Sequence, residues 1–254
     1  MSPSRAFARQ ELDQVVHTWR LYVLPGLLLF FGLTAPVLAA LLPELAEYAT
    51  GETPGAVIEL PPPTATDAYA QFLGNLQQLG SLVAVIIGAG VIASEVRTGT
   101  AALILAKPLS RTQYVLTKAT AHFLLTVAAA LAGAVACAAV TAVVFEVGPL
   151  GRFLAAIGCW TVLAAFLIAI ATLLSAALRS QMAAAAAAAA IAITVGALSQ
   201  VPAVGDYAPV GLWSAAGAIL TGEPARLAVP IVTAVAGTAA ALTAAVLVFR
   251  RREI

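Results

Sequence analysis

The chain has 254 residues, of which 61% are hydrophobic and only 10% are charged, and its formal net charge is +1. Soluble globular proteins carry about a quarter charged residues, so this composition excludes a soluble fold and indicates an integral membrane protein. The near-neutral charge gives no reason to expect a nucleic-acid partner. Both cysteines, Cys137 and Cys159, fall within apolar segments, a placement that favours neither a disulfide framework nor a zinc site.

Residues 1–20 form the first distinct segment. Its apolar residues share one face of a helix and its polar residues lie elsewhere; the apolar set is Ala8, Leu12, Val15, Val16 and Trp19. This pattern predicts an amphipathic helix on the inner membrane surface, with Trp19 as an interfacial anchor. The alternative is a solvated tail.

Six apolar segments are long enough to cross a membrane. They are Leu21–Leu42, Leu76–Ser94, Ala119–Phe145, Phe153–Leu178, Met182–Val201 and Leu227–Phe249. The shortest extends roughly 28 Å as a helix, which is about the hydrocarbon thickness. The leader before the first segment contains Glu11 and Asp13, which favours a retained span over a signal peptide. We therefore expect an all-α integral membrane protein with one transmembrane domain over residues 1–254.

The charges of the loops predict the orientation of these spans. If the amino terminus is cytoplasmic, the inner segments hold 11 basic residues and the outer segments hold only two, Arg152 and Arg226. Eight of the twelve acidic residues then lie outside. Because inner loops are enriched in Lys and Arg, we expect a multi-pass protein with both termini in the cytoplasm.

Three further segments have distinct predictions. The outer loop 43–75 contains five acidic residues, no basic residue and the run Pro61-Pro62-Pro63, which is expected to be extended. It is either a cap or a plain connector. Ser110 is a predicted N-cap for a helix that continues to Phe145, roughly 52 Å, so Arg111, Lys118 and His122 should project into the cytoplasm.

The last of these segments, 203–226, contains the apolar stretch Gly211–Gly222, which is too short to span a membrane. It predicts a re-entrant or interfacial helix on the outer side, before the last span. In the fifth span, Ala183–Ala190 is an unbroken run of alanine. Small side chains let helices approach closely, so this span forms a subunit interface, lines a pathway, or packs within the chain alone.

Several kinds of chemistry are missing from the sequence. The dipeptide Gly-Lys does not occur, which excludes a P-loop, and the only histidines are His17 and His122. No serine or cysteine has a credible base beside it, so we expect no catalytic site and no metal or cofactor in this chain. The middles of the spans lack ionisable residues, which disfavours ion-driven antiport.

The charged stretch 95–111, between the second and third spans, is the strongest functional signal. It combines a glycine hinge at Gly99, an apolar centre, and a Pro108-Leu109-Ser110-Arg111 sequence that ends one helix and starts another. A loop of this kind is suited to docking with a soluble partner. The alternative is an ordinary basic loop that obeys the positive-inside rule.

The pattern of Glu95, Gly99-Thr100, an apolar run, Lys107 to Arg111 and then Lys118 resembles the loop between the second and third spans of type-2 ABC exporter permeases. The six spans, the amphipathic amino-terminal helix and the short helix before the last span are similar to that class as well. The resemblance implies a permease that pairs with a second permease copy or homologue and with two separate ATPase subunits, which bind the ATP and Mg²⁺.

The resemblance also implies a coupling helix over Thr98–Ala106 that docks in a groove of the ATPase. The implied coupling residues are Glu95, Arg97, Gly99, Thr100, Leu103, Ile104, Leu105, Lys107, Pro108, Ser110 and Arg111. Leu103, Ile104 and Leu105 would enter the groove, and the rim would consist of Glu95, Arg97, Lys107 and Arg111. The loop Arg179–Gln181 is too short for a second coupling helix, so the amino-terminal helix would have to supply any second contact.

These observations favour an export permease of a bacterial plasma membrane, driven by a partner ATPase and carrying an amphipathic or hydrophobic substrate. The first alternative is a mechanical transducer that acts on an extracytoplasmic partner without moving solute. The second is an ATP-independent scaffold or secondary carrier. The sequence does not identify the substrate or distinguish a homodimer from a heterodimer.

Overall fold

The computed structural model describes residues 7, 11, 20–50, 61–106, 109–145 and 148–252. All regular elements among these residues are helical, and six helical segments are long and apolar enough to cross a membrane. In chain order, the helical elements are α2 (Arg20–Thr50), α3 (Ala65–Asn75), the π-helix η1 (Leu76–Gly80), α4 (Ser81–Arg97), α5 (Thr100–Leu105), α6 (Arg111–Val144), α7 (Leu150–Ala177), α8 (Gln181–Leu198), α9 (Pro202–Gly205), α10 (Gly211–Thr221) and α11 (Ala228–Arg251). The prediction of an all-α, six-span membrane protein is confirmed.

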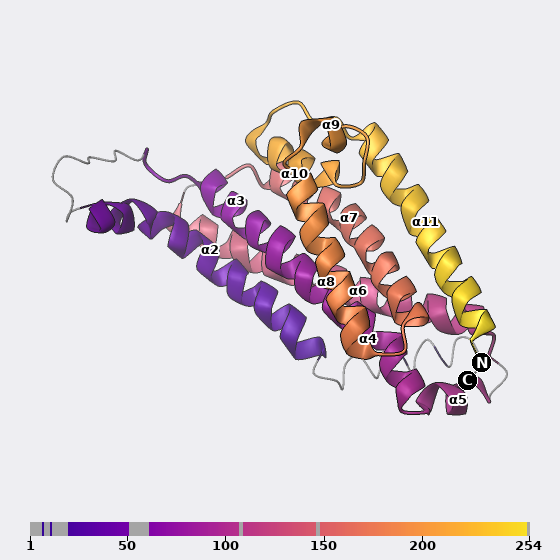
Figure 1. Ribbon diagram of the computed structural model, residues 1–254. Coiled ribbons are helices and arrows are strands. Elements are labelled where there is room, and N and C mark those ends of the chain that lie inside the picture. Colours follow the sequence, from indigo (N-terminus) through magenta and orange to yellow (C-terminus); the bar gives the residue numbers. More distant parts are fainter. Residues whose placement is uncertain are drawn as a thin grey trace.

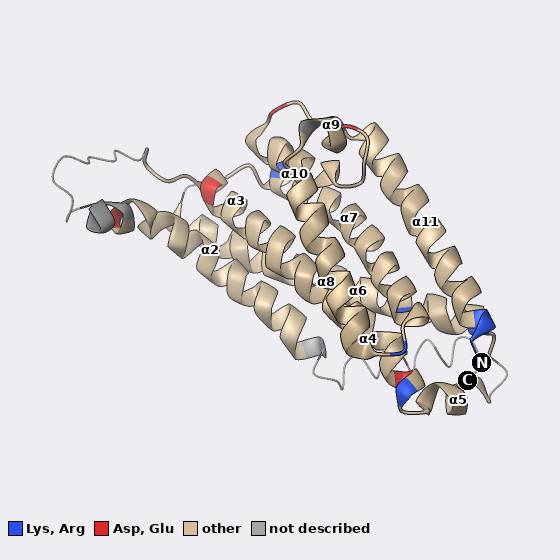
Figure 2. Ribbon diagram, in the orientation of Figure 1, with Lys and Arg blue, Asp and Glu red and all other residues tan. Residues whose placement is uncertain are grey.

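The long helices form a bundle around α7, which packs against α4, α6, α8, α10 and α11. The short helix α5 lies at one end of the bundle, and α9 and α10 lie at the other (Figure 1). We call these the α5 end and the α10 end. Trp160 in the middle of α7 is fully buried and donates a hydrogen bond from Nε1 to Ser81 Oγ at 2.9 Å. Lysine and arginine gather mainly at the α5 end (Figure 2).

Two glycines bring α2 and α6 into close contact. A Cβ on Gly32 would lie 2.2 Å from the carbonyl oxygen of Gly133, and a Cβ on Gly133 would lie 2.5 Å from that of Leu28. No side chain larger than hydrogen fits at either position. The backbones therefore approach as closely as small residues allow in membrane helices.

The second span is longer than the sequence predicted. Helical structure runs without a break from Ala65 to Arg97, through α3, η1 and α4, and does not begin at Leu76. Thr64 starts α3 through a capping box with Asp67, a local signal that the apolar pattern did not include. Tyr69 then stacks on Phe153 of α7, with ring centroids 4.2 Å apart.

The prediction that residues 43–75 form an outer loop is wrong at both ends of this range, where the chain is helical. Helix α2 continues through Pro43 to Thr50, and α3 occupies the last part of the predicted loop. Pro61–Pro63 is non-helical, as predicted. The remaining residues, 51–60, lie outside the described part of the chain.

The other predicted elements agree with the structure to within a few residues. Helix α6 begins at Arg111 with Ser110 as its N-cap, and it ends at Val144. The predicted short helix is α10, which ends where Gly222 adopts a φ of 84°. Its position relative to the membrane stays a prediction. The turn between α7 and α8 is short, because Ser180 already caps α8.

Candidate functional site

The chain leaves α4 by a sharp turn at Gly99. Thr98 closes the end of α4 by donating its backbone N–H to the carbonyl of Ser94, and Gly99 follows with a φ of 75°. This is the left-handed region, where a side chain is disfavoured, so the predicted glycine hinge is present. The hydroxyls of Thr98 and Thr100 lie 2.9 Å apart across the turn. Helix α5 then runs from Thr100 to Leu105, slightly shorter than the Thr98–Ala106 that we expected.

Helix α5 has one face on the protein and one face free. Ala101 and Ile104 are buried against the bundle, whereas Ala102 and Leu103 are exposed, Leu103 to 75%. Of the three apolar residues expected to enter a partner's groove, only Leu103 is fully available. Ile104 is 8% exposed and Leu105 is partly buried, because both pack into the core of this chain.

The buried face of α5 belongs to a second, smaller core at this end of the bundle. Its buried members come from the ends of several spans and include Ile92, Tyr114, Val115, Ala176, Ala245 and Phe249. The ends of α4, α6, α7 and α11 therefore share one core with the buried face of α5. Because such cores are closely packed, we expect a displacement of α5 to affect the ends of these spans.

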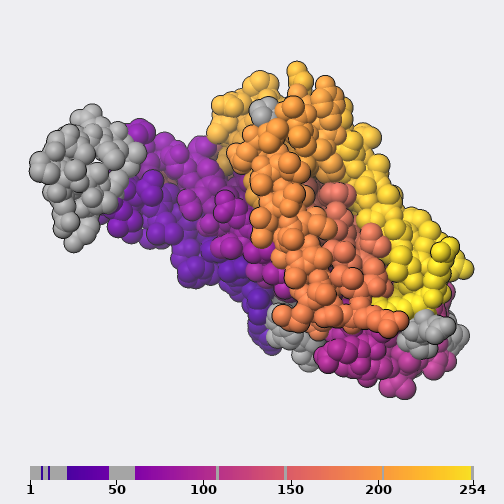
Figure 3. All heavy atoms as spheres, in the orientation of Figure 1, coloured from indigo at the N-terminus to yellow at the C-terminus, as the bar shows by residue number. Residues whose placement is uncertain are grey.

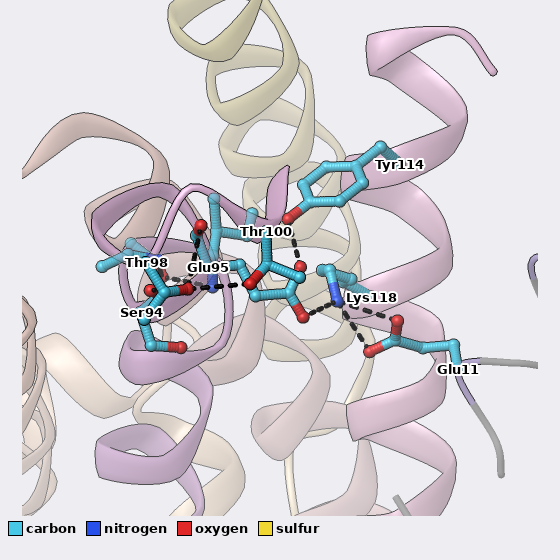
Figure 4. A network of polar contacts seen from close by, with 10 residues as sticks. Glu11, Ser94, Glu95, Thr98, Thr100, Tyr114 and Lys118 are labelled. Carbon is cyan, nitrogen blue, oxygen red and sulfur yellow. Dashed lines mark hydrogen bonds and ion pairs between the residues drawn. The ribbon is translucent and has the colours of Figure 1, made fainter. Parts of the chain in front are cut away.

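A buried ion network lies beneath α5 (Figure 4). Lys118 of α6 has no solvent exposure, and its Nζ lies 2.8 Å from Glu11 Oε2 and 2.7 Å from Glu95 Oε1. The side chains of Glu11 and Glu95 are 4% and 16% exposed. A buried charge is tolerated only when it is paired, and here one ammonium pairs with two carboxylates from distant parts of the sequence.

Tyr114 joins this network to the second core. Its hydroxyl donates to Glu95 Oε2 at 2.6 Å, and its ring stacks with those of Phe249 and Phe7, with centroids 5.2 Å and 5.8 Å away. The Lys118 ammonium lies 5.1 Å from the centre of the same ring. Glu95, at the end of α4, is thereby linked to the amino-terminal segment, to α6 and to α11.

These contacts correct two expectations. Lys118 and His122 do not project from the bundle, since both are buried, and the Nε2 of His122 lies 2.8 Å from the carbonyl oxygen of Ala84. Glu95 is not a free rim residue, because both of its carboxylate oxygens are engaged inside the protein. Arg97 is exposed, as a rim residue should be.

Two arginines cap the ends of neighbouring spans. Arg111, next to the capping box of Ser110 and Gln113, donates from NH1 to the carbonyls of Phe249, Arg250 and Arg252 at the end of α11. Arg252 in turn donates to the carbonyls of Ala176 and Leu178 at the end of α7. Cations satisfy the free carbonyls and favour the dipole at helix carboxyl ends. Arg111, like Glu95, therefore has its partners within this chain and is not a free rim residue.

Of the predicted site residues, Glu95 and Arg97 lie at the end of α4, Gly99 and Thr100 at the start of α5, and Ser110 and Arg111 at the start of α6. Lys107 and Pro108 lie outside the described residues, as does the predicted amphipathic segment apart from Phe7, Glu11 and Arg20.

Sequence reasoning missed Glu11, Tyr114 and Phe249 as members of this site. One signal in the sequence could have indicated Glu11. Charged residues at the ends of spans, such as Lys118 and Glu95, require partners, and the predicted topology places few acidic residues on the same side of the membrane.

Comparison with known proteins relates the chain to a family of transporters and to a bacterial membrane protein. Residues 5–208 match the family described as "ABC-2 family transporter protein". The chain is also 24% identical, over 221 residues, to the "Uncharacterized transmembrane protein YxlG" of Bacillus subtilis (strain 168), a match that covers 87% of this chain and 86% of that protein.

Proposed function

The chain belongs to the ABC-2 family of transporter membrane proteins, and we propose that it is the permease subunit of an exporter driven by a separate ATPase. In this proposal the ATPase binds ATP and Mg²⁺, and this chain supplies no catalytic group. The α5 end faces the cytoplasm, in agreement with the basic residues gathered there. The membrane is the plasma membrane of a bacterium.

The observation that carries the proposal is the construction of α5. This short helix lies outside the spans, exposes Leu103, and shares a core with the ends of four of them. A soluble subunit that grips its free face can therefore move α4, α6, α7 and α11 together. Beneath α5, the buried ion pair of Lys118 with Glu95 joins α6 to α4, so these two helices should move together.

The cargo class is proposed from a recess near the α10 end. It has a volume of about 400 Å³ and lies between η1, the start of α4, α8 and α10. Its lining combines apolar groups with amide side chains, among them Leu82, Ile193, Gln77, Gln200 and Trp213. A mixed lining of this kind, without an ionisable side chain, suits an amphipathic or hydrophobic substrate.

A second permease completes the proposed transporter. Helix α8 lies along the outside of the bundle (Figure 3), and only 22% of its residues are buried. Its buried stripe is Ala184, Ala188, Ala192 and Val195, so other small residues of the alanine run face outward. Small outward residues suit close packing against another membrane helix.

Replacement of Leu103 by aspartate tests the proposal. Burial of a leucine contributes about 1.5–3 kcal/mol, and Leu103 has three quarters of its surface available. Its loss should cost about 1–2 kcal/mol, or roughly fivefold to thirtyfold in affinity, before the cost of burying the new carboxylate is added. Co-purification of the ATPase subunit and ATP-dependent efflux from vesicles should both fall, while membrane insertion is unchanged.

Two variants control for side effects. Leu103→Met keeps an apolar side chain at the same place and should retain ATPase binding. Gln113→Glu adds a negative charge at the same end, outside α5, and preserves the capping box at Ser110. If Leu103→Asp bound the ATPase as well as Gln113→Glu did, α5 would not be the docking element.

A further inference from the structure

Four arginines line a single recess at the α5 end. Arg97 lies at the end of α4, Arg179 lies in the turn after α7, and Arg251 and Arg252 lie at the end of α11; Val96 completes the lining. The recess has a volume of about 540 Å³ and is open to the surroundings. These residues are far apart in the sequence, and the packing of α4, α7 and α11 brings them together.

The positive charge of this recess is not balanced by its lining. No acidic side chain is among the described residues that line it. Burial, and secondly the nearby charge of Arg179, lower the pKa of Arg252. Like charges held this close repel one another, so an anion between them would relieve the repulsion.

At least one of the four arginines is fixed in place. Arg252 donates from NH1 to the carbonyl of Ala176 at 2.8 Å and from NH2 to that of Leu178 at 3.3 Å. Its charge is therefore oriented before any ligand arrives, while Arg97, Arg179 and Arg251 are exposed around it. A fixed cation with others around it is an arrangement suited to an oxyanion with several acceptor oxygens.

We propose that this arginine recess binds a phosphate group. Each arginine lies where a membrane-crossing helix ends, so the recess is at the level of the lipid headgroups. An anionic phospholipid is one source of the phosphate, and free phosphate is the other. The proposal requires only that the chain spans a membrane, so it stands or falls separately from the transport function.

The test uses the full-length purified chain and a matched pair of variants. Arg179→Gln removes one charge from the recess. Arg250→Gln removes the same charge from the neighbouring position on α11, which does not line the recess. The probes are phosphatidylglycerol and phosphatidylcholine in mixed micelles, with retained lipid counted by native mass spectrometry, and inorganic phosphate alone, measured by calorimetry. Thermal stability of each variant in detergent verifies that it is folded.

We expect the wild type to retain phosphatidylglycerol over phosphatidylcholine. Arg179→Gln should weaken that binding about tenfold, as the loss of a charge-assisted hydrogen bond does, and Arg250→Gln by about twofold or less at physiological salt. Binding of inorganic phosphate with the same dependence on Arg179 would identify free phosphate as the ligand. Equal losses in the two variants, or no binding of either probe, would overturn the proposal.

Discussion

Substitutions of the different members of the ion network beneath α5 are predicted to have different effects on stability. Replacement of Lys118 by methionine keeps most of the length of the side chain and removes the cation that pairs with Glu11 and Glu95. The two carboxylates, 4% and 16% exposed, are then left together without the cation that pairs with them. Breaking a buried ion pair in this way costs about 3–5 kcal/mol. Lys118→Met should therefore destabilise the protein strongly.

Neutralising one carboxylate should cost much less. With both glutamates ionised, the network has two negative charges and one positive charge, so Glu95→Gln leaves Lys118 paired with Glu11 at 2.8 Å. The glutamine oxygen still accepts from Tyr114, and the expected loss is that of one hydrogen bond to a charged group, about 1.5–3 kcal/mol. A triple variant, Glu11→Gln with Glu95→Gln and Lys118→Met, removes every charge and should recover most of the stability lost in Lys118→Met.

The assay is unfolding of the purified protein in detergent, followed for the wild type and the three variants under one condition. Lys118→Met should lose more stability than Glu95→Gln, and the triple variant should be more stable than Lys118→Met. Equal stability of Lys118→Met and the wild type would refute this expectation, since the network would then be solvated. A triple variant no more stable than Lys118→Met would refute the attribution to unpaired charge.

Two pairs of substitutions at glycines give further predictions. Gly32→Ala places a methyl group 2.2 Å from the carbonyl oxygen of Gly133 and should cost about 1–3 kcal/mol of stability in unfolding measurements. The control, Gly26→Ala on the same helix, meets nothing within 4 Å and should be neutral or stabilising. Equal effects of the two substitutions would contradict the close packing of α2 and α6. Gly99→Ala, at a φ of 75°, should cost about 1–2 kcal/mol and weaken binding of the ATPase, and Gly99→Asn should be milder, because asparagine tolerates the left-handed region. If alanine and asparagine bound the ATPase equally well, the turn would not position α5.

The spans and the capping signals could be predicted because they are local. Apolar length gives the six crossings, and Ser110 with Gln113 starts α6 at the predicted residue. The missed start of the second span has a local cause too. Thr64 and Asp67 form a capping box, but the helix that follows contains Asp67, Gln71 and Asn75, so hydropathy alone does not include it in a span.

The contacts of the site could not be predicted because they join distant segments. Glu11 reaches Lys118 across 107 positions, and Arg111 reaches the end of α11 across 138. Neither partner is indicated by spacing. The same packing decides which side of α5 is free. Leu103 is exposed and Ile104 is buried, although the sequence predicted the same role for both.

The most direct measurement of the central claim is the accessibility of α5 with and without its partner. Both native cysteines, Cys137 and Cys159, are buried, so Leu103→Cys adds a thiol at an exposed position, and Thr221→Cys adds one at the other end of the bundle. In inside-out membrane vesicles, a membrane-impermeant maleimide should label the Leu103→Cys protein quickly and the Thr221→Cys protein hardly at all. Addition of the ATPase subunit should protect the Leu103→Cys protein from labelling. Labelling of Leu103→Cys at an unchanged rate in an assembled, ATP-hydrolysing complex would contradict the account.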